Sequence, residues 1–378
     1  MKTPSGKIIK SLGKDYSFYL PNPLPPKIDW SLNLVNALSN ADRLLGYLAG
    51  EGGKLSNPHI LIRPFMAREA VLSSQIEGTQ ATIGDILAAN AGILPNANID
   101  DVKEVNNYIT ALEYGIKRIE KIPLSLRLLK ELHAKLMTNV RGEYATPGEF
   151  RRSQNWIGPA GCTLMTATYV PPSQEYLMEC LGELENFLHD TTLPPLVQIA
   201  LIHYQFEAIH PFLDGNGRVG RLLITLFLIE RDVLPTPLLY LSAFFEASRK
   251  EYYKKLLAVT QEGAWEDWLF YFFTGVAQQS EDAISRIKRI NNLLDTWRQK
   301  TTGISNQIID KLGSNPFITI NKAAELMNVS YTTMQRSIAN LERLGILYET
   351  SGSKRNRVYC ARDIMFILEE PTKINYHI

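Results

Sequence analysis

The chain has 378 residues and a formal net charge of +1, and 45% of its residues are hydrophobic while 21% are charged. This balance is typical of a globular protein of two or three domains, and it excludes a strongly basic protein drawn to nucleic acid or to anionic membranes. No apolar run approaches the roughly 20 residues of a membrane-spanning helix, and the start lacks an apolar signal region. The cysteines are too few and too widely spaced for a disulfide framework or a zinc site. We therefore expect a protein of the reducing cytoplasm.

The N-terminal region predicts an extended entry followed by two helices. Residues 1–29 are rich in proline and should run extended over the surface. Asp29 is a suitable cap for a first helix whose apolar residues, within 34–48, recur at helical spacing. Pro64 and Gly78 then suit the first position and the C-terminal stop of a second helix.

Three more helices and a hairpin are predicted before the middle of the chain. Thr82 and Asp85 form a weak capping pair for a short helix, and two scaffold helices follow at 100–120 and 125–137. Between residues 142 and 172 the pattern changes to two short strands around a Gly/Pro turn, which predicts a hairpin.

The densest cluster of chemical groups is the stretch from Ile209 to Arg221, which reads I-H-P-F-L-D-G-N-G-R-V-G-R. It follows a helical apolar run that begins at Pro195, and a second such run comes after it. The glycines let backbone amides face a ligand at the N-terminus of the next helix, and the two arginines add bidentate phosphate donors. His210 can accept a proton near neutral pH, and Asp214 is a hard oxygen ligand suited to Mg²⁺ beside phosphates. The stretch predicts a site for a polyphosphate, a metal ion and a proton acceptor.

Two other interpretations of this stretch are weaker. Its glycines match the G-x-G-x-x-G dinucleotide pattern, but that pattern should follow a strand, whereas the preceding segment has helical spacing. The stretch could also be an ordinary loop in which Asp214 and Asn216 are turn and cap residues. A histidine at its start and two arginines on one side favour a site. His203, one or two turns earlier, is expected to be structural.

The run from His210 to Arg218, continuing to Arg221, resembles the signature loop of the Fic family of nucleotidyltransferases (AMPylators), and the resemblance covers about 24–275. It implies transfer of AMP from ATP to a Ser, Thr or Tyr hydroxyl of a target protein, with release of pyrophosphate. His210 would be the base, Asp214 would hold Mg²⁺, and the backbone amides and an asparagine side chain of the loop would hold phosphate oxygens. The residues expected to bind the nucleotide are Gly215, Asn216, Gly217, Arg218, Val219, Gly220, Arg221, Ser248 and Tyr253.

The resemblance also assigns a role to Glu77. On the residues alone, a carboxylate in the last turn of a helix opposes the helix dipole and is read as a solvated surface side chain. However, Ser73-x-x-x-Glu77-Gly78 resembles the inhibitory motif of Fic proteins that carry it N-terminal to the catalytic core. This implies that Glu77, on a helix over about 64–77, pairs with Arg221 and inhibits the enzyme.

Segments on both sides of the motif fit the same resemblance. The hairpin at 155–170 is similar to the flap, whose exposed edge would hold the target peptide by strand addition. Residues 239–254 match the family's next helix, and the aromatic residues within 265–273 are expected in the core. A charged amphipathic helix at 280–300 then serves as a spacer.

The last residues, 304–378, predict a second unit. Helices at 304–312, 321–327 and 331–344, followed by a hairpin with its tip at 352–357, resemble a winged helix. From residue 301 onward there are nine basic and seven acidic residues, a balance of about +2 that is low for tight DNA binding. Weak DNA binding, protein docking and dimerisation therefore all remain open. The residues expected on its recognition helix and wing are Gln335, Arg336, Asn340, Lys354, Arg355 and Arg357.

These predictions combine into a mainly helical protein, a Fic-type bundle with a β-hairpin flap and a C-terminal winged helix-turn-helix domain. The expected domains are an N-terminal helical region at 1–115, a catalytic core at 116–275, a helical linker at 276–303 and the winged helix at 304–378. The expected function is an autoinhibited protein adenylyltransferase. The alternatives are a DNA-binding regulator that only senses nucleotide, and an enzyme that uses another nucleotide or removes AMP. His210 favours an enzyme, because a sensor needs the phosphate loop but no base.

Overall fold

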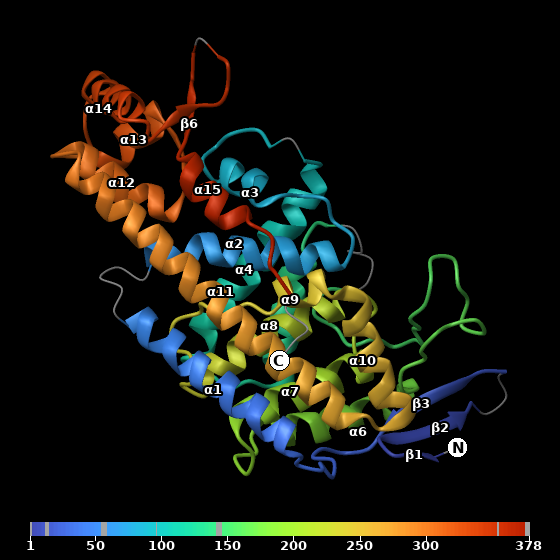
Figure 1. Cartoon of the computed structure of the whole chain (residues 1–378). Coiled ribbons are helices and arrows are strands. Elements are labelled where there is room, and N and C mark those ends of the chain that lie inside the picture. Colours follow the sequence, from blue (N-terminus) through green and yellow to red (C-terminus); the bar gives the residue numbers. More distant parts are fainter. Residues whose placement is uncertain are drawn as a thin grey trace.

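The computed structural model describes residues 2–11, 15–53, 59–95, 97–140, 146–353 and 355–374 as a mainly helical bundle that continues into a smaller C-terminal unit (Figure 1). Lys354, predicted on the wing, lies outside the described residues. The helices are α1 (Leu32–Gly53), α2 (His59–Ile76), α3 (Ile83–Asn90), α4 (Ile99–Ile119), α5 (Leu126–Leu136), α6 (Gln174–Leu188), α7 (Pro195–Ile209), α8 (Asn216–Glu230), α9 (Ser242–Ala247), α10 (Arg249–Glu262), α11 (Trp265–Gln299), α12 (Ile304–Ser314), α13 (Ile320–Met327), α14 (Tyr331–Arg343) and α15 (Arg362–Glu369). The strands are β1 (Lys2–Thr3), β2 (Gly6–Lys10), β3 (Ser17–Pro21), β4 (Phe317–Thr319), β5 (Tyr348–Glu349) and β6 (Val358–Cys360).

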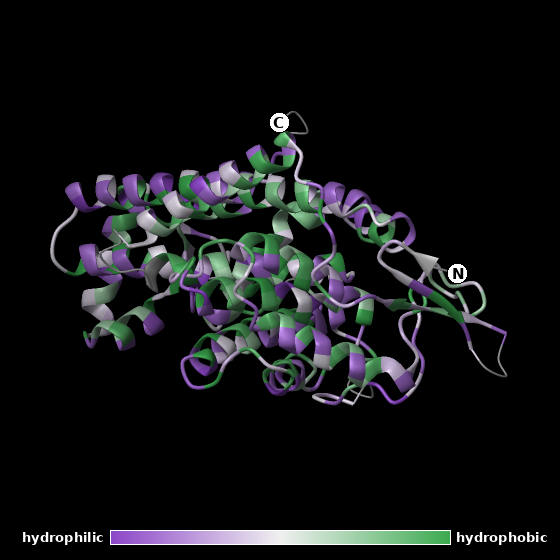
Figure 2. Cartoon of the chain, turned by 90° about the horizontal axis from the view of Figure 1, so that it is seen from below, coloured by the Kyte–Doolittle hydropathy of each residue, from purple (hydrophilic) through white to green (hydrophobic). Residues whose placement is uncertain are grey.

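Two apolar helices, α7 and α8, run through the middle of the bundle. All residues of α7 except Pro195 and Glu207 are buried, and a helix that is apolar on every side is stable only inside a core. Figure 2 shows hydrophobic residues concentrated toward the middle of the bundle, while the peripheral helices alternate between hydrophobic and hydrophilic residues. The loop between α7 and α8 is therefore held at both ends by the core. Within the described residues, no helix has the length and apolar character needed to cross a membrane.

Helix α11 connects the bundle to the C-terminal unit without a break. It has 35 residues, α1 packs along it, and its buried face continues from Trp268 to Trp297. The boundary predicted at residue 275 falls inside this helix. Most of the predicted spacer, 276–303, is therefore a packed part of the bundle, because its apolar stripe meets α1 and the C-terminal helices.

The N-terminal residues form a sheet, whereas the sequence predicted an extended entry over the surface. β1, β2 and β3 pair antiparallel in that order. Ser5 Oγ donates to the Val259 carbonyl at 2.6 Å, and the Tyr19 N–H donates to the Val170 carbonyl at 2.9 Å. The sheet thereby links α10 to the end of the segment predicted as the flap. Pro4 in the turn between β1 and β2 interrupts the apolar alternation, which weakened the strand signal.

The first two helices begin at other residues than predicted. Ser31, not Asp29, caps α1, since the Leu34 N–H donates to Ser31 Oγ at 3.3 Å. α2 begins before Pro64 and encloses it, although Pro64 was expected at the first position. Gly78 follows the end of α2 with a φ of +106°, a conformation that favours glycine. The next three helices, α3, α4 and α5, lie close to their predicted bounds.

The C-terminal unit contains the helices and hairpin expected there. β4 precedes α13 and α14, and the three strands form a sheet in the order β4-β6-β5. Thr319 and Ser330 cap the two helices, accepting from the Lys322 and Thr333 N–H groups at 3.3 and 3.2 Å. Asn328, with a φ of +51°, makes the turn between them.

Buried arginines fasten the last residues of the chain to the bundle. Arg286 on α11 donates to the carbonyl oxygens of Ile367 and Glu370, the latter at 2.8 Å. Arg68 on α2 donates to Thr372 Oγ1 at 2.8 Å, and α12 and α15 also pack on α2. We call these contacts of Arg68 and Arg286 the C-terminal clamp. Through it, the C-terminal unit covers the outer side of α2.

Candidate functional site

The loop between α7 and α8 passes twice through left-handed backbone conformations. His210 ends α7 with φ +49° and ψ +62°, and Gly215 begins α8 with φ +77°. A Cβ at Gly215 would approach Met137 Sδ to 3.0 Å, so both conformation and space favour glycine there. A non-glycine residue such as His210 carries strain in this conformation, and such residues cluster at functional sites.

The side chain of Asn216 closes this loop. Its Oδ1 accepts from the Phe212 N–H at 2.8 Å, its Nδ2 donates to the Phe212 carbonyl at 2.9 Å, and the residue is 2% exposed. Arg151 Nε and Asn155 Nδ2 add donors to the carbonyls of His210 and Phe212, at 3.0 and 2.8 Å. The sequence predicted that the Asn216 side chain holds phosphate oxygens, but both of its polar ends are already used. Its backbone N–H, in the first turn of α8, is the group left for an anion.

His133 on α5 holds the loop through a hydrogen bond to the backbone of Asp214. From the sequence, α5 was expected to be a scaffold helix only. The Nδ1 of His133 accepts from the Gly148 N–H at 2.8 Å, so its Nε2 carries the proton donated to the Asp214 carbonyl at 3.0 Å. Burial lowers the pKa of His133 to about 4, which keeps the ring neutral. The ring stacks on Phe212 at 3.9 Å. A single histidine in an amphipathic helix gave no sequence signal for this contact.

The imidazole of His210 is oriented as a proton acceptor. Its Nδ1 lies 3.3 Å from the Glu207 carbonyl, and a carbonyl only accepts, so Nδ1 carries a hydrogen and Nε2 is the accepting nitrogen. Burial lowers the pKa of His210 to about 4, and the hydrogen bond to Glu207 opposes this only in part. The ring is therefore neutral at pH 7, the form that a general base requires.

Glu77 lies over the N-terminus of α8, where free amides and the helix dipole favour a negative group. Its Oε1 accepts from Arg221 Nη2 at 2.6 Å, so the predicted contact between the two residues is present. A Cβ placed on Gly217 would overlap the same oxygen. The carboxylate therefore lies against the first turn of α8, beside the guanidinium of Arg221.

Ser73 holds the other side of the same guanidinium. Its Oγ and carbonyl accept from Arg221 Nε and Nη2 at 2.8 and 2.9 Å, and Arg221 is 2% exposed. Burial disfavours the charge of Arg221, but the neighbouring Glu77 raises its pKa above the ordinary value. Burial also disfavours the charge of Glu77, yet Arg221 lowers its pKa. Both groups are therefore charged at neutral pH, with Glu77 as the more exposed partner.

The other motif arginine is also enclosed. Arg218 Nη1 contacts Glu104 Oε2 on α4 at 3.3 Å, and Arg218 Nη2 lies 3.8 Å from Asp214 Oδ1. Glu104 holds this guanidinium in place, so a phosphate that shares a metal ion with Asp214 would lie beside Arg218. The predicted scaffold helix α4 therefore positions one of the site's cations.

Val219 and Gly220 serve the packing of α8, although both were predicted to bind nucleotide. Val219 is completely buried. A Cβ on Gly220 would collide with Glu207 and approach Phe206 of α7, and the Gly220 carbonyl lies 3.2 Å from Nδ1 of His203. These positions let α7 and α8 approach each other closely. His203 is fully buried, in agreement with its expected structural role.

Asp214 suits a metal ion that is shared with a phosphate ligand. Its side chain is 52% exposed beside the start of α8, and its Oδ1 accepts from the Gly215 N–H at 2.6 Å. Within the described residues, no group of three His, Cys, Asp or Glu side chains could hold a metal by itself. Mg²⁺ is commonly bound through one or two carboxylates together with substrate phosphates, so this donor set fits Mg²⁺ only when a nucleotide is present.

A cavity of about 610 Å³ opens next to the loop, between the predicted flap, the end of α7 and α10. Tyr253, predicted to bind nucleotide, lines it and is 43% exposed. Ser248, also predicted to bind nucleotide, is instead buried, and its Oγ bonds to the Phe244 carbonyl and to Tyr271 at 2.6 and 2.7 Å. These bonds link Ser248 to α9 and α11, and Ser248 is not among the residues that line the cavity. Residues that line the cavity include Gly158, Tyr169, Tyr204, Glu207, Tyr253 and Leu257.

The predicted flap is less regular than expected. A single antiparallel bridge joins Ile157 and Tyr169, with hydrogen bonds of 2.9 and 3.0 Å, and the residues between them form turns and not two strands. Tyr169 is anchored, since its hydroxyl donates to the Ala208 carbonyl at 2.6 Å. Trp156, Ile157 and Met165 leave apolar surface exposed along this segment.

One short loop of this helical bundle thus carries a proton acceptor, His210, an exposed carboxylate, Asp214, and the N-terminus of α8. Residues 35–117 match the profile of the Fic/DOC family N-terminal domain, and residues 123–228 match that of the Fic/DOC family. Together these matches cover half of the chain, and the chain belongs to the Fic/DOC family.

Relatives and solved structures support the same family. The chain is 27% identical over 250 residues to protein adenylyltransferase fic-1 of Caenorhabditis elegans, covering 63% of this chain and 45% of that protein. It is 31% identical over 167 residues to protein adenylyltransferase Fic of Drosophila yakuba, covering 42% of this chain and 31% of that protein. The chain thus spans less than half the length of these relatives.

Two solved structures share the fold. A Fic family protein from Desulfovibrio desulfuricans aligns with a TM-score of 0.61 at 20% identity, over 89% of this chain and 98% of that one. Residues 134–508 of Fic-1 from C. elegans align with a TM-score of 0.53 at 25% identity, over 70% and 74% of the two chains.

Proposed function

We propose that this protein is an adenylyltransferase that moves AMP from ATP to a hydroxyl side chain of a target protein. The observation that carries the proposal is that the accepting nitrogen of His210, the carboxylate of Asp214 and the free amides at the start of α8 share one short loop. Relatives that match this region are named protein adenylyltransferases. All three cysteines are free thiols, in keeping with the cytoplasm as the proposed compartment.

In the proposed reaction, Nε2 of His210 takes the proton of the target hydroxyl while its oxygen forms a bond to the α-phosphorus of ATP. The bond from this phosphorus to the pyrophosphate oxygen breaks, and pyrophosphate leaves with both electrons of that bond. The amides of Gly215–Gly217 hold the phosphate oxygens, with positioning and charge stabilisation as the main sources of rate. Asp214 would hold Mg²⁺, which when bound would neutralise charge on the departing group.

Glu77 is proposed to inhibit this reaction. It pairs with the guanidinium of Arg221 and lies over Gly217, where a phosphate of a well-placed ATP would bind. The carboxylate and the phosphate compete for the same helix N-terminus and the same arginine. Release of Glu77 would therefore be a requirement for productive binding of ATP.

The flap segment is proposed to hold the target. Tyr169 and Val170 are already paired, with Ile157 on one side and Tyr19 of β3 on the other. The outer edge of the flap therefore belongs to the segment at Asn155–Gly158, beside the exposed Trp156. An extended target peptide would add along this edge and present its hydroxyl to His210.

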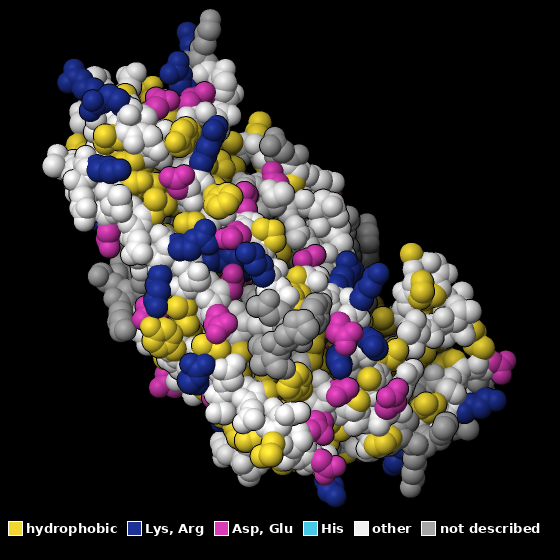
Figure 3. Space-filling model, viewed as in Figure 1, with side chains coloured by type: hydrophobic (Ala, Val, Ile, Leu, Met, Phe, Trp, Pro, Cys, Tyr) yellow, Lys and Arg dark blue, Asp and Glu magenta, His cyan; other side chains and the backbone are white. Residues whose placement is uncertain are grey.

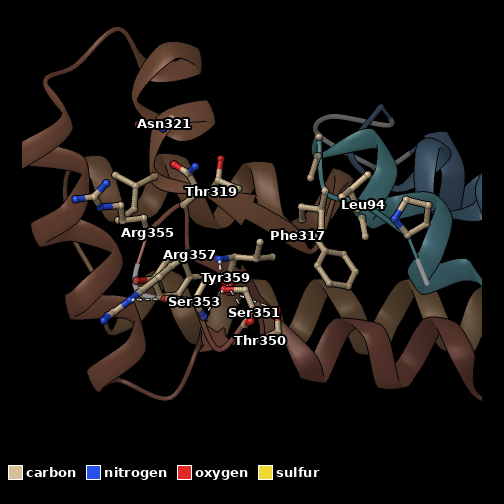
Figure 4. A pocket seen from close by; sticks show the side chains of 18 of the residues that line it. Leu94, Phe317, Thr319, Asn321, Thr350, Ser351, Ser353, Arg355, Arg357 and Tyr359 are labelled. Carbon is tan, nitrogen blue, oxygen red and sulfur yellow. Dashed lines mark hydrogen bonds between the residues drawn. The ribbon is translucent and has the colours of Figure 1, made fainter.

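The C-terminal unit is proposed to be a winged helix that docks a partner. Its order of elements is helix, strand, helix, helix and two strands, and basic side chains gather over α13, α14 and the loop after β5 (Figure 3). A groove of about 1300 Å³ separates this loop from the segment after α3. Figure 4 shows Arg355 and Arg357 on one side of the groove, with Leu94 and Phe317 on the other.

The low net charge of this unit favours a protein partner, either a target or a second copy of the chain, over duplex DNA. A gel-shift assay at two salt concentrations tests for DNA, because binding to phosphates must weaken as salt rises. Sedimentation of the chain alone tests for a homodimer.

Transfer from ATP labelled separately at the α- and γ-phosphates tests the proposed reaction. We expect label from the α position only, a requirement for Mg²⁺ that is weakened in Asp214→Asn, and loss of transfer in His210→Ala while nucleotide binding persists. Label from the γ position would identify a kinase and refute the proposal. Nucleotide binding without transfer would favour a nucleotide sensor over an enzyme. Faster transfer from another nucleoside triphosphate would assign that nucleotide, and not ATP, as the substrate. Release of AMP from a modified target would assign removal of AMP as the reaction.

A further inference from the structure

One carboxyl group beside the catalytic loop has no task in the fold or in the proposed mechanism. Glu207 lies in the last turn of α7, a helix in which only it and Pro195 are not buried. It lines the cavity of about 610 Å³. Its Oε1 is enclosed against Gly220 and has no hydrogen-bond partner within the part of the chain that the structure describes. Because Oε1 itself is enclosed, a ligand would reach this carboxyl group on the side that lines the cavity, where a donor would offset the cost of burying the group.

The surroundings of Glu207 place it next to the phosphate end of the site. Burial raises its pKa to about 7, while Arg221 lowers that pKa and Glu77 raises it. These are the two groups that meet over the start of α8. The backbone carbonyl of Glu207 also holds the ring of His210. In the proposed reaction His210 acts at the α-phosphorus, and the part of ATP bonded to that phosphate is the ribose, so a group beside His210 meets the sugar before it meets the base.

We propose that Glu207 accepts hydrogen bonds from the ribose hydroxyls of the bound nucleotide and makes the site selective for ribonucleotides. This inference rests on the proposed nucleotide binding. A carboxylate is an acceptor with two oxygens, and neighbouring hydroxyls are matching donors, as for the acidic residue that binds ribose in dinucleotide-binding folds. The remaining cavity, with Tyr253 and Leu257, offers the aromatic and apolar surface that suits the base.

Binding measurements with sugar-modified nucleotides test the proposal directly. The parent is Glu77→Gly, in which the start of α8 is open, and titration calorimetry compares ATP, 2′-deoxy-ATP and 3′-deoxy-ATP. The titrations are run at pH 8, above the pKa of Glu207, so that the group is mostly ionised. We expect at least one deoxy nucleotide to bind about ten- to a hundredfold more weakly than ATP, the range of a hydrogen bond to a charged group. Adding Glu207→Ala should remove this difference, because ATP can then no longer donate to the carboxylate either.

Two further variants separate a contact with the sugar from a disturbance of the fold. Glu207→Gln keeps the shape and one accepting oxygen, so part of the selectivity should remain and the melting temperature should not fall. Glu262→Ala removes an exposed carboxylate at the end of α10 and should leave all three affinities unchanged.

The inference and the proposed function fail by different results. Equal weakening of all three nucleotides by Glu207→Ala would show a structural role, and a change in preference between ATP and GTP would show contact with the base. Either result would overturn the inference about Glu207. The transfer of label from ATP would still test the proposed function independently. Ribose selectivity that depends on Glu207, without transfer of the α-phosphate, would uphold the inference and refute adenylyl transfer. Failure of the parent to bind any nucleotide would refute both.

Discussion

Replacing Glu77 by glycine should make self-modification faster and lower the ATP concentration needed for half-maximal rate. The substitution removes one charged hydrogen bond of 2.6 Å between Glu77 and Arg221, whose side chains are 34% and 2% exposed. Hydrogen bonds to charged groups contribute roughly 1.5–3 kcal/mol, and exposure of one partner to water reduces this value. Taking the low end, about 1.5 kcal/mol, the bound phosphate gains a factor of about ten in apparent affinity.

The assay is the initial rate of transfer from α-labelled ATP over a range of ATP concentrations. Glu77→Gln keeps an acceptor but not the charge, so it should lie between wild type and Glu77→Gly. Glu120→Gly is a matched control, because it also removes an exposed carboxylate just after a helix, α4, and should change nothing. Arg221→Ala removes the inhibitory ion pair and a phosphate donor together and should not activate. If Glu77→Gly folds normally and has the ATP dependence and rate of wild type, Glu77 and ATP do not compete for this site.

Three other predictions concern the base, the loop and the C-terminal unit. Because burial lowers the pKa of His210 to about 4, the base stays neutral on acidification. At saturating ATP, transfer by Glu77→Gly should therefore hold constant from pH 7.5 to about 5 and fall toward pH 4; a midpoint near the ordinary value of 6.5 would contradict this. Asn216→Ala leaves the Phe212 N–H without its partner, while the Phe212 carbonyl keeps the hydrogen bond from Asn155. Urea unfolding should therefore show a loss of roughly 1–3 kcal/mol, and a loss below about 0.5 kcal/mol, as at ordinary surface positions, would disprove the bridging role. Alanine at both Arg355 and Arg357 should leave self-modification within about twofold of wild type while weakening partner binding, and a large loss of self-modification would assign them to catalysis.

The sequence was most informative where function depends on neighbours along the chain. The motif from His210 to Gly217 predicted its own turn, the helix after it and the phosphate-binding end, because glycine conformation and helix termini are local properties. The contact between Glu77 and Arg221 came from resemblance and not from physics. Considered alone, Glu77 opposes the dipole of α2, and only the tertiary structure brings it to the N-terminus of α8, where the dipole is favourable.

Most of the residues that were missed or misassigned depend on long-range contacts, and Asn216, which bonds to Phe212 four residues away, is an exception. Nothing in the sequence distinguishes an asparagine that binds phosphate from one that closes its own loop, as Asn216 does. His133 and Arg151 support the motif from segments far away along the chain, so spacing could not reveal them. Glu207 did leave a signal, since it is an acidic residue in a helix that is otherwise apolar almost throughout. The N-terminal sheet is another long-range product, because Tyr19 is fixed by pairing with Val170.

The C-terminal clamp sets limits on how this chain can change by recombination. Loss of the residues after α11 would remove the acceptors of Arg68 and Arg286 and uncover the side of α2 on which α12 packs. The same helix ends at Ile76, directly before Glu77, so we expect a shortened gene to produce a protein in which the proposed inhibitory residue is poorly anchored. The loop at 350–357 takes no part in the clamp and is free to diverge. We therefore expect new partners to be acquired most readily by changes in that loop, whereas exchange of the whole C-terminal unit would disturb the proposed inhibition by Glu77.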